Sequence, residues 1–319
     1  MSITCRRRIA RHSGSAAAIV VFGFLVFVGS ANAQQSGTIE SGQFDLEYRI
    51  EGAGTPAIVI GFPNYYGRVF STNLRSQLRF VFVDHRGSAP SPGAVPLSEY
   101  SLEQISDDIE LVRTELNLGP VVIIGHSAHA LMALEYGKKY PESVSRVVMI
   151  GIAPDLSDES NLEAEEYWEK MATAERKAAL DSNWEGVLQE EPEESYPGEN
   201  FINTYVRNGP MAWYDHKFDS TPLWKGVDAN MEMLGHVSGT LLAEIDITKG
   251  LEEFDRPVFL ALGKYDFLVA QPSSWNRIKS KFNDLTIRVF DESRHTPQYE
   301  QAELFDSELL NWIQGSASD

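Results

Sequence analysis

Cysteine is almost absent from this chain of 319 residues, and the one cysteine is Cys5. A chain with a single thiol cannot form an internal disulfide framework, so its core alone must stabilise the fold. A zinc site built on several cysteines is excluded for the same reason. No H-E-x-x-H motif, G-x-G-x-x-G motif or phosphate-binding loop is present either, and the sequence therefore predicts neither a metal nor a cofactor.

Basic residues are also scarce. Lysine and arginine number 27 against 46 aspartates and glutamates, which gives a formal net charge of −19. A protein this acidic is repelled by phosphate backbones and by anionic lipid, so binding to nucleic acid or to a membrane surface is not expected. We expect the partner to be a small-molecule substrate. The sequence leaves the oligomeric state open.

Long hydrophobic runs are missing, and the strongest one, Ala16 to Val28, is too short to span a bilayer comfortably. Arginines at positions 6, 7, 8 and 11 precede this run, and the small-residue triplet Ala31-Asn32-Ala33 follows it. This order is typical of a secretory signal peptide, predicted here as residues 1–33 with cleavage before Gln34. We therefore expect an exported protein, periplasmic or secreted. An uncleaved N-terminal anchor is the alternative.

Beyond Gln34, short apolar runs alternate with segments of helical periodicity. Continuous apolar runs of strand length indicate buried parallel strands, and their alternation with helices predicts an α/β fold with a mostly parallel sheet covered on both faces. Phe44 to Glu51 alternates apolar and polar residues, as a half-exposed edge strand does. The expected buried strands are Ala57 to Gly61, Phe80 to Asp84, Val121 to Ile124, Arg146 to Ile152, Pro257 to Leu262 and Leu285 to Phe290; the expected helices are Ser101 to Leu118, Ala130 to Tyr140 and Ala302 to Ile313.

Residues 155–255 interrupt this alternation, because they contain no convincing buried strand. The segment is rich in acidic and aromatic residues, and it is helical by pattern around Glu163 to Leu180. We predict that it is a helical cap inserted over the carboxyl end of the sheet. The core is then formed by residues 34–154 and 256–319.

The run Gly125-His126-Ser127-Ala128-His129 joins an expected strand directly to an expected helix. A tight turn at the carboxyl edge of a parallel sheet exposes one side chain above the crevice where ligands bind, and here that side chain is a serine. The run resembles the nucleophile elbow of the α/β-hydrolase family, G-x-S-x-G, with His129 in place of the second glycine. The resemblance extends from about Phe44 to Ile313.

This resemblance implies a Ser-Asp-His triad in the chain order of the family. Ser127 matches the nucleophile. Asp266, in G-K-Y-D after an expected strand, matches the acid, and His295 matches the base, although Arg294 stands where the family usually has glycine. Asp291 and Asp255 are the alternative acids.

An oxyanion hole is implied as well, formed by the backbone N–H of Ala128 and by that of Phe62 in the loop Ile60 to Gly67. The pocket candidates are His129, Tyr65, Trp213 and Tyr214. For His129 a packed or hydrogen-bonded role is preferred to a role in lining the pocket.

Two further motifs point to the branch of the family that contains the proline iminopeptidases: Asp84 to Ser91 (D-H-R-G-S-A-P-S), expected to be scaffold, and Y-P-E-S-V after the elbow helix. The H-G-G-P-G and G-G-S-W-G motifs of the iminopeptidases are missing. The sequence therefore favours a serine hydrolase that acts through an acyl-enzyme on a small or medium ester, lactone or amide. An iminopeptidase-like aminopeptidase is the alternative. A ligand-binding homologue with slow or no turnover is the alternative from another class.

Overall fold

The computed structural model describes residues 35–90, 93, 95–185, 196 and 198–315. The predicted signal peptide, residues 1–33, lies outside these residues. No helix among the described residues combines the length and apolar character needed to cross a bilayer.

Eight strands form one sheet in the order β1-β2-β4-β3-β5-β6-β7-β8. The β1–β2 and β2–β4 pairs are antiparallel, and all the pairs from β4–β3 to β7–β8 are parallel. The strands are β1 (Gln35–Ser41), β2 (Phe44–Glu51), β3 (Thr55–Ile60), β4 (Leu78–Val83), β5 (Val121–His126), β6 (Val144–Ile150), β7 (Val258–Gly263) and β8 (Leu285–Phe290). The prediction of β2 as an edge strand is wrong, because β1 pairs with its outer side along its length.

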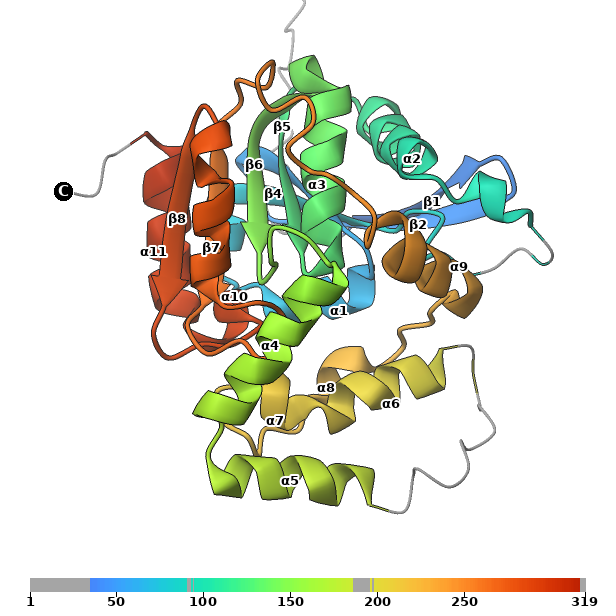
Figure 1. Ribbon diagram of the computed structural model, residues 1–319. Helices are drawn as coiled ribbons and strands as arrows, with labels where there is room; N and C mark the ends of the chain where they lie inside the picture. Colours follow the sequence, from blue (N-terminus) through green and yellow to red (C-terminus); the bar gives the residue numbers. More distant parts are fainter. Residues whose placement is uncertain (1–34, 91–92, 94, 186–195, 197, 316–319) are drawn as a thin grey trace, which may run out of the picture. The chain divides into compact units, whose positions relative to one another are not determined.

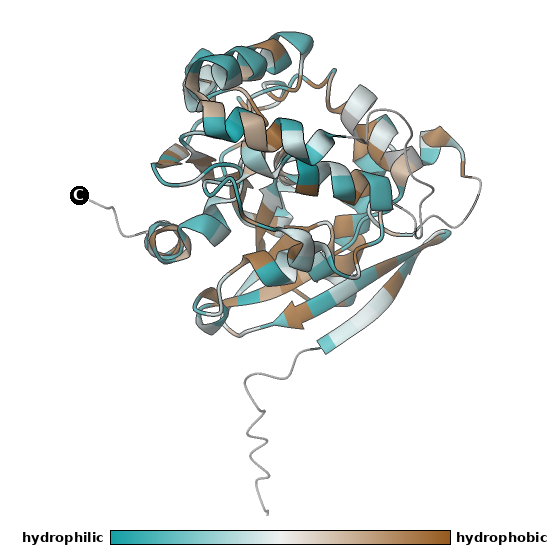
Figure 2. Ribbon diagram, turned by 90° about the horizontal axis from the view of Figure 1, so that it is seen from below, coloured by the Kyte–Doolittle hydropathy of each residue, from teal (hydrophilic) through white to brown (hydrophobic). Residues whose placement is uncertain are grey.

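Two hydrophobic layers cover the two faces of the sheet. Because successive strand residues point to opposite faces, Ile58, Ile123 and Val147 pack with helices α2 (Leu102–Glu115) and α3 (Ala128–Lys139). Their sequence neighbours on the other face pack with α1 (Pro63–Val69) and α11 (Ala302–Ile313). In Figure 2 the helices carry teal as well as brown segments, as elements with one buried and one hydrated face do.

The helices between β6 and β7 form the cap. They gather beyond the carboxyl ends of the strands (Figure 1) and comprise α4 (Asp158–Met171), α5 (Ala174–Trp184), α6 (Glu199–Arg207), α7 (Gly209–Ala212), α8 (Thr221–Trp224), α9 (Met231–His236) and the π-helical turn η4 (Val237–Leu241). The helix expected around Glu163 to Leu180 is in fact two helices. Thr173 separates them, because its side chain accepts a hydrogen bond from the N–H of Arg176 and so caps α5.

The remaining helical elements are short. They are α10 (Pro297–Glu300) and the 3-10 turns η1 (Leu74–Ser76), η2 (Leu97–Glu99), η3 (Pro141–Ser143), η5 (Pro272–Arg277) and η6 (Lys279–Lys281). The predicted fold is confirmed: an α/β protein with a mostly parallel sheet, helices on both faces and an inserted helical cap.

A buried ion pair ties the turn after β4 to α2. Asp108 is fully buried, and its carboxylate accepts from the backbone N–H of Arg86 at 3.0 Å, from Arg86 Nε at 2.8 Å and from Arg86 Nη2 at 2.7 Å. The hydroxyl of Ser41 at the end of β1 donates to the same carboxylate at 2.6 Å. The turn predicted as scaffold is thus joined to β1 and α2 through one carboxylate.

Replacing Asp108 tests this connection. Asp108→Asn leaves the buried Arg86 guanidinium with only the more distant, exposed carboxylate of Glu99 at 3.6 Å, so the free energy of unfolding should fall by about 3 kcal/mol. Urea unfolding followed by circular dichroism measures the loss. Glu103→Gln on the exposed side of the same helix is the control, and its effect should stay within about 0.5 kcal/mol. Equal effects of the two substitutions would contradict this account of the turn.

Candidate active site

Ser127 lies between the last residue of β5 and the first residue of α3, in a strained backbone conformation. Its φ is 57° and its ψ is −136°, a region that residues with a side chain rarely adopt. The Ser127 N–H donates to the carbonyl oxygen of Ile150 at 2.8 Å, which fixes the turn to β6. A Cβ on Gly125 would stand 2.0 Å from the carbonyl oxygen of His129, so only glycine permits this close approach of helix and strand.

Asp266 and His295 meet at the same edge of the sheet. Asp266 follows β7, His295 follows β8, and His295 Nδ1 lies 2.7 Å from Asp266 Oδ2. The second carboxylate oxygen, Oδ1, accepts from the N–H of Leu268 at 2.9 Å. Both side chains are buried. The carboxylate is therefore held on both oxygens and orients the imidazole.

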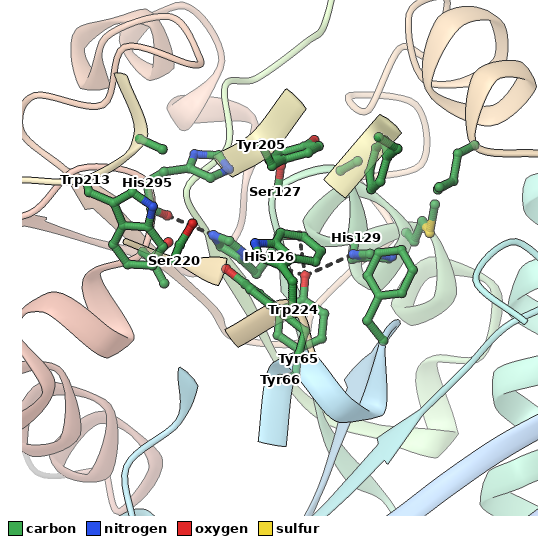
Figure 3. Close-up of a pocket in the computed structure, with 17 residues that line it drawn as sticks. Tyr65, Tyr66, His126, Ser127, His129, Tyr205, Trp213, Ser220, Trp224 and His295 are labelled. Carbon is green, nitrogen blue, oxygen red and sulfur yellow. Dashed lines mark hydrogen bonds between the residues drawn. The ribbon is translucent and has the colours of Figure 1, made fainter. Parts of the chain in front are cut away.

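The other ring nitrogen, His295 Nε2, is buried and has no hydrogen-bond partner among the described residues. Ser127 and His295 line the same cavity, and Figure 3 shows both side chains at its wall. No hydrogen bond between Ser127 Oγ and Nε2 is present in the described part of the chain. A buried nitrogen without a hydrogen-bond partner costs free energy. Such nitrogens are typical of active sites, where the hydrogen bond forms only in the complex with substrate.

The alternative acids lie elsewhere. Asp291 pairs with Lys264 at 2.8 Å, and Asp255 lies 3.4 Å from Arg256. Both carboxylates are exposed. Solvated carboxylates paired with surface cations do not orient a buried imidazole, so the geometry favours Asp266.

The sequence pattern does not single out His126, which the structure places at the site. Its Nε2 lies 2.8 Å from the carbonyl oxygen of His295, which connects the elbow to the loop after β8. Burial, together with the neighbouring His295, lowers the pKa of His126 well below its ordinary value. A neutral His126 can donate from Nε2 to this carbonyl. Its place directly before Ser127 was the only signal in the sequence.

The two candidate oxyanion donors also line the cavity. Phe62 follows β3 and caps α1 with a φ of 23°, a value that side chains rarely tolerate. Ala128 is the first residue of α3, and the first N–H groups of a helix have no intrahelical partner. No hydrogen bond from either N–H group is present in the described residues. Both are therefore available to an oxygen bound between them.

His129 is both packed and part of the cavity wall. Its Nδ1 lies 3.1 Å from the hydroxyl of Tyr66, and its ring stands where a Cβ on Gly61 would come within 2.4 Å of Nε2. Gly61 thus provides the space that the second elbow glycine provides in the family pattern. Burial lowers the pKa of His129 to about 3, so its imidazole is neutral.

The cavity is walled mainly by aromatic side chains. Its empty volume is about 740 Å³, part of it open to solvent, and its wall includes Tyr65, Tyr66, Tyr205, Trp213 and Trp224 (Figure 3). The candidate Tyr214 does not line it. The chain turns away from the cavity after Trp213. Tyr214 is therefore 43% exposed, and its ring stacks with the guanidinium of Arg294.

A second cavity adjoins Ser127, Ala128 and His295, with an empty volume of about 900 Å³, part of it open to solvent. Phe201 and Tyr205 of α6 line both cavities, while Ile152, Leu156, Leu268 and Val269 line only the second. Within the described residues, no aspartate or glutamate lines either cavity, and no cluster of three or more histidine, cysteine or acidic side chains is arranged to hold a metal ion.

This combination of sheet order, strained serine turn and convergent side chains defines an α/β-hydrolase, and comparison with known proteins agrees. The α/β-hydrolase fold family matches residues 53–302. AB hydrolase superfamily protein YclE of Bacillus subtilis (strain 168) is 35% identical over 280 residues, which cover 88% of this chain and 99% of the relative. The chain therefore belongs to the α/β-hydrolase fold family.

Solved structures show the same fold. Proline iminopeptidase of Mycobacterium smegmatis superposes with a TM-score of 0.67 at 17% identity and covers 88% of this chain and 98% of that one. An esterase from Exiguobacterium antarcticum superposes with a TM-score of 0.58 at 19% identity. The match covers 88% of this chain and 100% of that one. The resemblance inferred from the elbow is confirmed, and proline iminopeptidases are among the similar proteins.

Restoring the family glycine at position 129 tests the packing of the histidine. His129→Gly removes the nearest hydrogen-bond partner of the Tyr66 hydroxyl and opens a cavity, so at pH 8 it should lower the free energy of unfolding by about 2–4 kcal/mol. A histidine with a lowered folded pKa contributes stability above the unfolded value near 6.5, and this contribution is lost as the pH falls. The difference between wild type and variant should therefore shrink between pH 8 and pH 5. Urea titrations at both pH values measure it, and a constant difference would contradict a neutral, packed His129.

Proposed function

We propose that this protein is a serine hydrolase in which Ser127 is the nucleophile, His295 the general base and Asp266 the residue that orients the base. The observation that carries the proposal is the 2.7 Å bond between His295 Nδ1 and Asp266 Oδ2, with Nε2 left unpaired at the cavity that Ser127 also lines. A serine hydroxyl is a weak nucleophile unless such a base accepts its proton.

The steps follow from these positions. As Ser127 Oγ attacks a carbonyl carbon, its proton passes to His295 Nε2, and the carbonyl oxygen becomes an oxyanion that the N–H groups of Phe62 and Ala128 stabilise. The imidazolium then gives its proton to the leaving oxygen as the bond to that oxygen breaks. Water hydrolyses the acyl-enzyme by the same proton path and regenerates Ser127.

The two cavities support an ester substrate with an apolar group on each side of the carbonyl. Both cavities meet at Ser127, Ala128 and His295. The first has mainly aromatic walls, and the second has aliphatic side chains together with Phe201 and Tyr205. An acyl group and an alcohol group leave the carbonyl in different directions, so each can occupy one cavity. A lactone, in which the two groups are joined, needs the same junction.

The aminopeptidase alternative ranks second. Some similar proteins are proline iminopeptidases. Recognition of a free amine requires a nearby anion, and the described residues that line the two cavities include no carboxylate. The acidic residues at 190, 191, 193 and 194 of the cap lie outside the described residues.

We also propose that the protein is exported. The basic segment, the apolar run and the Ala31-Asn32-Ala33 triplet support cleavage before Gln34. The first strand begins at Gln35, so the predicted cut would leave every described element intact.

Covalent labelling distinguishes an enzyme from a ligand-binding homologue. A fluorophosphonate probe should label one site per chain, at Ser127, and Ser127→Ala should abolish labelling. Asp266→Asn keeps the shape of the side chain but not its charge, and it should lower kcat for p-nitrophenyl esters about 10⁴-fold. Absence of labelling in the folded wild-type protein would favour the ligand-binding homologue.

A comparison of substrates distinguishes esters from peptides. We expect hydrolysis of p-nitrophenyl esters, with kcat/KM rising as the acyl chain lengthens until the cavity is filled, and little hydrolysis of prolyl-p-nitroanilide. The reason is that apolar walls reward buried CH₂ groups and offer no counter-charge to an amine. Release of p-nitroaniline faster than release of p-nitrophenol would reverse this ranking.

A further inference from the structure

Arg294 occupies the position directly before His295 and contacts both neighbours of Asp266. Its Nη1 donates to the carbonyl oxygen of Tyr265 at 2.5 Å, and its Cζ lies 4.6 Å from the ring centroid of Phe267. The side chain is 7% exposed. The loop that carries the base is therefore attached to the loop that carries the acid through a second contact, independent of the bond between His295 and Asp266.

The same residue reaches the cap. Arg294 Nε donates to the carbonyl oxygen of Trp213 at 3.0 Å. The backbone N–H of His295 donates to the carbonyl oxygen of Ala212, also at 3.0 Å. Glu300 adds a bridge, because its carboxylate accepts from the N–H of Tyr214 at 2.5 Å and from the N–H of Arg294 at 2.8 Å. The cap segment Ala212 to Tyr214 is thus bonded to the base loop at three successive residues.

A second buried arginine holds this segment from the cap side. Arg176 of α5 donates to the carbonyl oxygens of Pro210 at 2.6 Å, Trp213 at 2.9 Å and Tyr214 at 2.6 Å. The carbonyl oxygen of Trp213 accordingly accepts from both arginines. Among the described residues, no carboxylate lies within ion-pair distance of either guanidinium.

Burying two guanidinium groups without paired carboxylates costs free energy. Their hydrogen bonds to backbone carbonyl oxygens must offset this cost. Burial and the nearby Arg176 lower the pKa of Arg294 to about 10, which leaves it charged at neutral pH. Its planar group bonds two carbonyl oxygens from different loops and stacks on an aromatic ring. A lysine ammonium can do this only in part, since it lacks the planar, forked geometry.

We propose that Arg294 is a positioning residue that couples the cap to the acid and the base. It holds the loops of Asp266 and His295 in register and sets both against the cap segment Ala212 to Tyr214. Trp213 lines the aromatic cavity, so a substrate group that packs on its ring acts on the alignment of the base through Arg294. This inference rests on the proposed function, because it requires His295 to be the base.

The kinetic test compares Arg294→Ala and Arg294→Lys with wild type on a p-nitrophenyl ester. Loss of alignment should lower kcat about 10–100-fold for Arg294→Ala, with KM within about twofold, and Arg294→Lys should recover part of the loss. Active-site titration with the fluorophosphonate should still label one site per chain, but more slowly. A fall in the number of labelled sites without a change in rate per site would indicate a structural role alone and overturn the proposal.

Arg277→Ala is the matched control. Arg277 also joins core to cap, since it donates to two residues of α4: Glu163 Oε1 at 2.9 Å and Ser160 Oγ at 3.2 Å. It makes no hydrogen bond to the loop of Asp266 or to the loop of His295 among the described residues. This variant should retain kcat within about twofold. An equal fall in kcat for Arg277→Ala would show that any loosening of the cap suffices, which contradicts a specific role for Arg294.

A double-substitution cycle tests the coupling itself. Arg176→Ala should lower kcat when Arg294 is present and add little when Arg294 is already alanine, because its effect passes through Arg294. Arg176→Lys with Arg294→Lys gives the same cycle if an alanine variant does not fold. Independent, multiplicative effects on kcat would overturn the coupling. Fluorophosphonate labelling of the wild-type protein separates failure of this proposal from failure of the proposed function. If the wild type is not labelled, the proposed function fails. If it is labelled, a negative result in the cycle concerns only the role of Arg294.

Discussion

A single left-handed residue, Ser127, is the constraint on which the rest of the site depends. Because its backbone turns within one residue, β5 passes directly into α3, and the hydroxyl stands at the carboxyl edge of the sheet. The strain is sustained by the bond from its N–H to Ile150 and by the close contact at Gly125, where no side chain fits. The parallel sheet brings the loops after β7 and β8 to the same edge, so the buried Asp266–His295 pair lies at the cavity that Ser127 also lines.

The rings of two buried histidines, His85 and His129, contact each other beside the elbow. Burial holds the imidazoles of His85 and His129 neutral by lowering the pKa of each to about 3, and it raises the pKa of Glu300 to about 7. The described residues that line the aromatic cavity include no aspartate, glutamate, lysine or arginine, and burial keeps the lining imidazoles of His126 and His129 neutral. In such a wall the fixed N–H dipoles act with little screening, which strengthens their effect on developing charge. The cap supplies Trp213 to the cavity wall, and the two buried arginines hold its carbonyl oxygen in place.

The sequence predicted the fold well where local patterns are strong. The capping box at Ser101 marks the start of α2, and the bounds of β8 and α11 agree with their apolar patterns. Strand β1 was missed, because a mostly exposed strand that pairs along one side leaves little apolar pattern. The resemblance to the hydrolases identified candidate residues for the triad, and the structure brings Asp266 and His295 together. The bond from His126 to the His295 carbonyl and the contacts of Arg294 with the cap join residues far apart in the chain, so no local pattern indicates them.

A crystal structure of the protein after reaction with a fluorophosphonate would test the central claim most directly. We expect phosphorus bonded to Ser127 Oγ, with one phosphonyl oxygen about 2.7–3.1 Å from the backbone nitrogens of both Phe62 and Ala128. His295 Nε2 should then be within hydrogen-bond distance of an oxygen of the adduct, while Nδ1 keeps its bond to Asp266. An adduct whose oxygens point away from those two N–H groups, or an imidazole turned away from Ser127 with Asp266 unpaired, would contradict it.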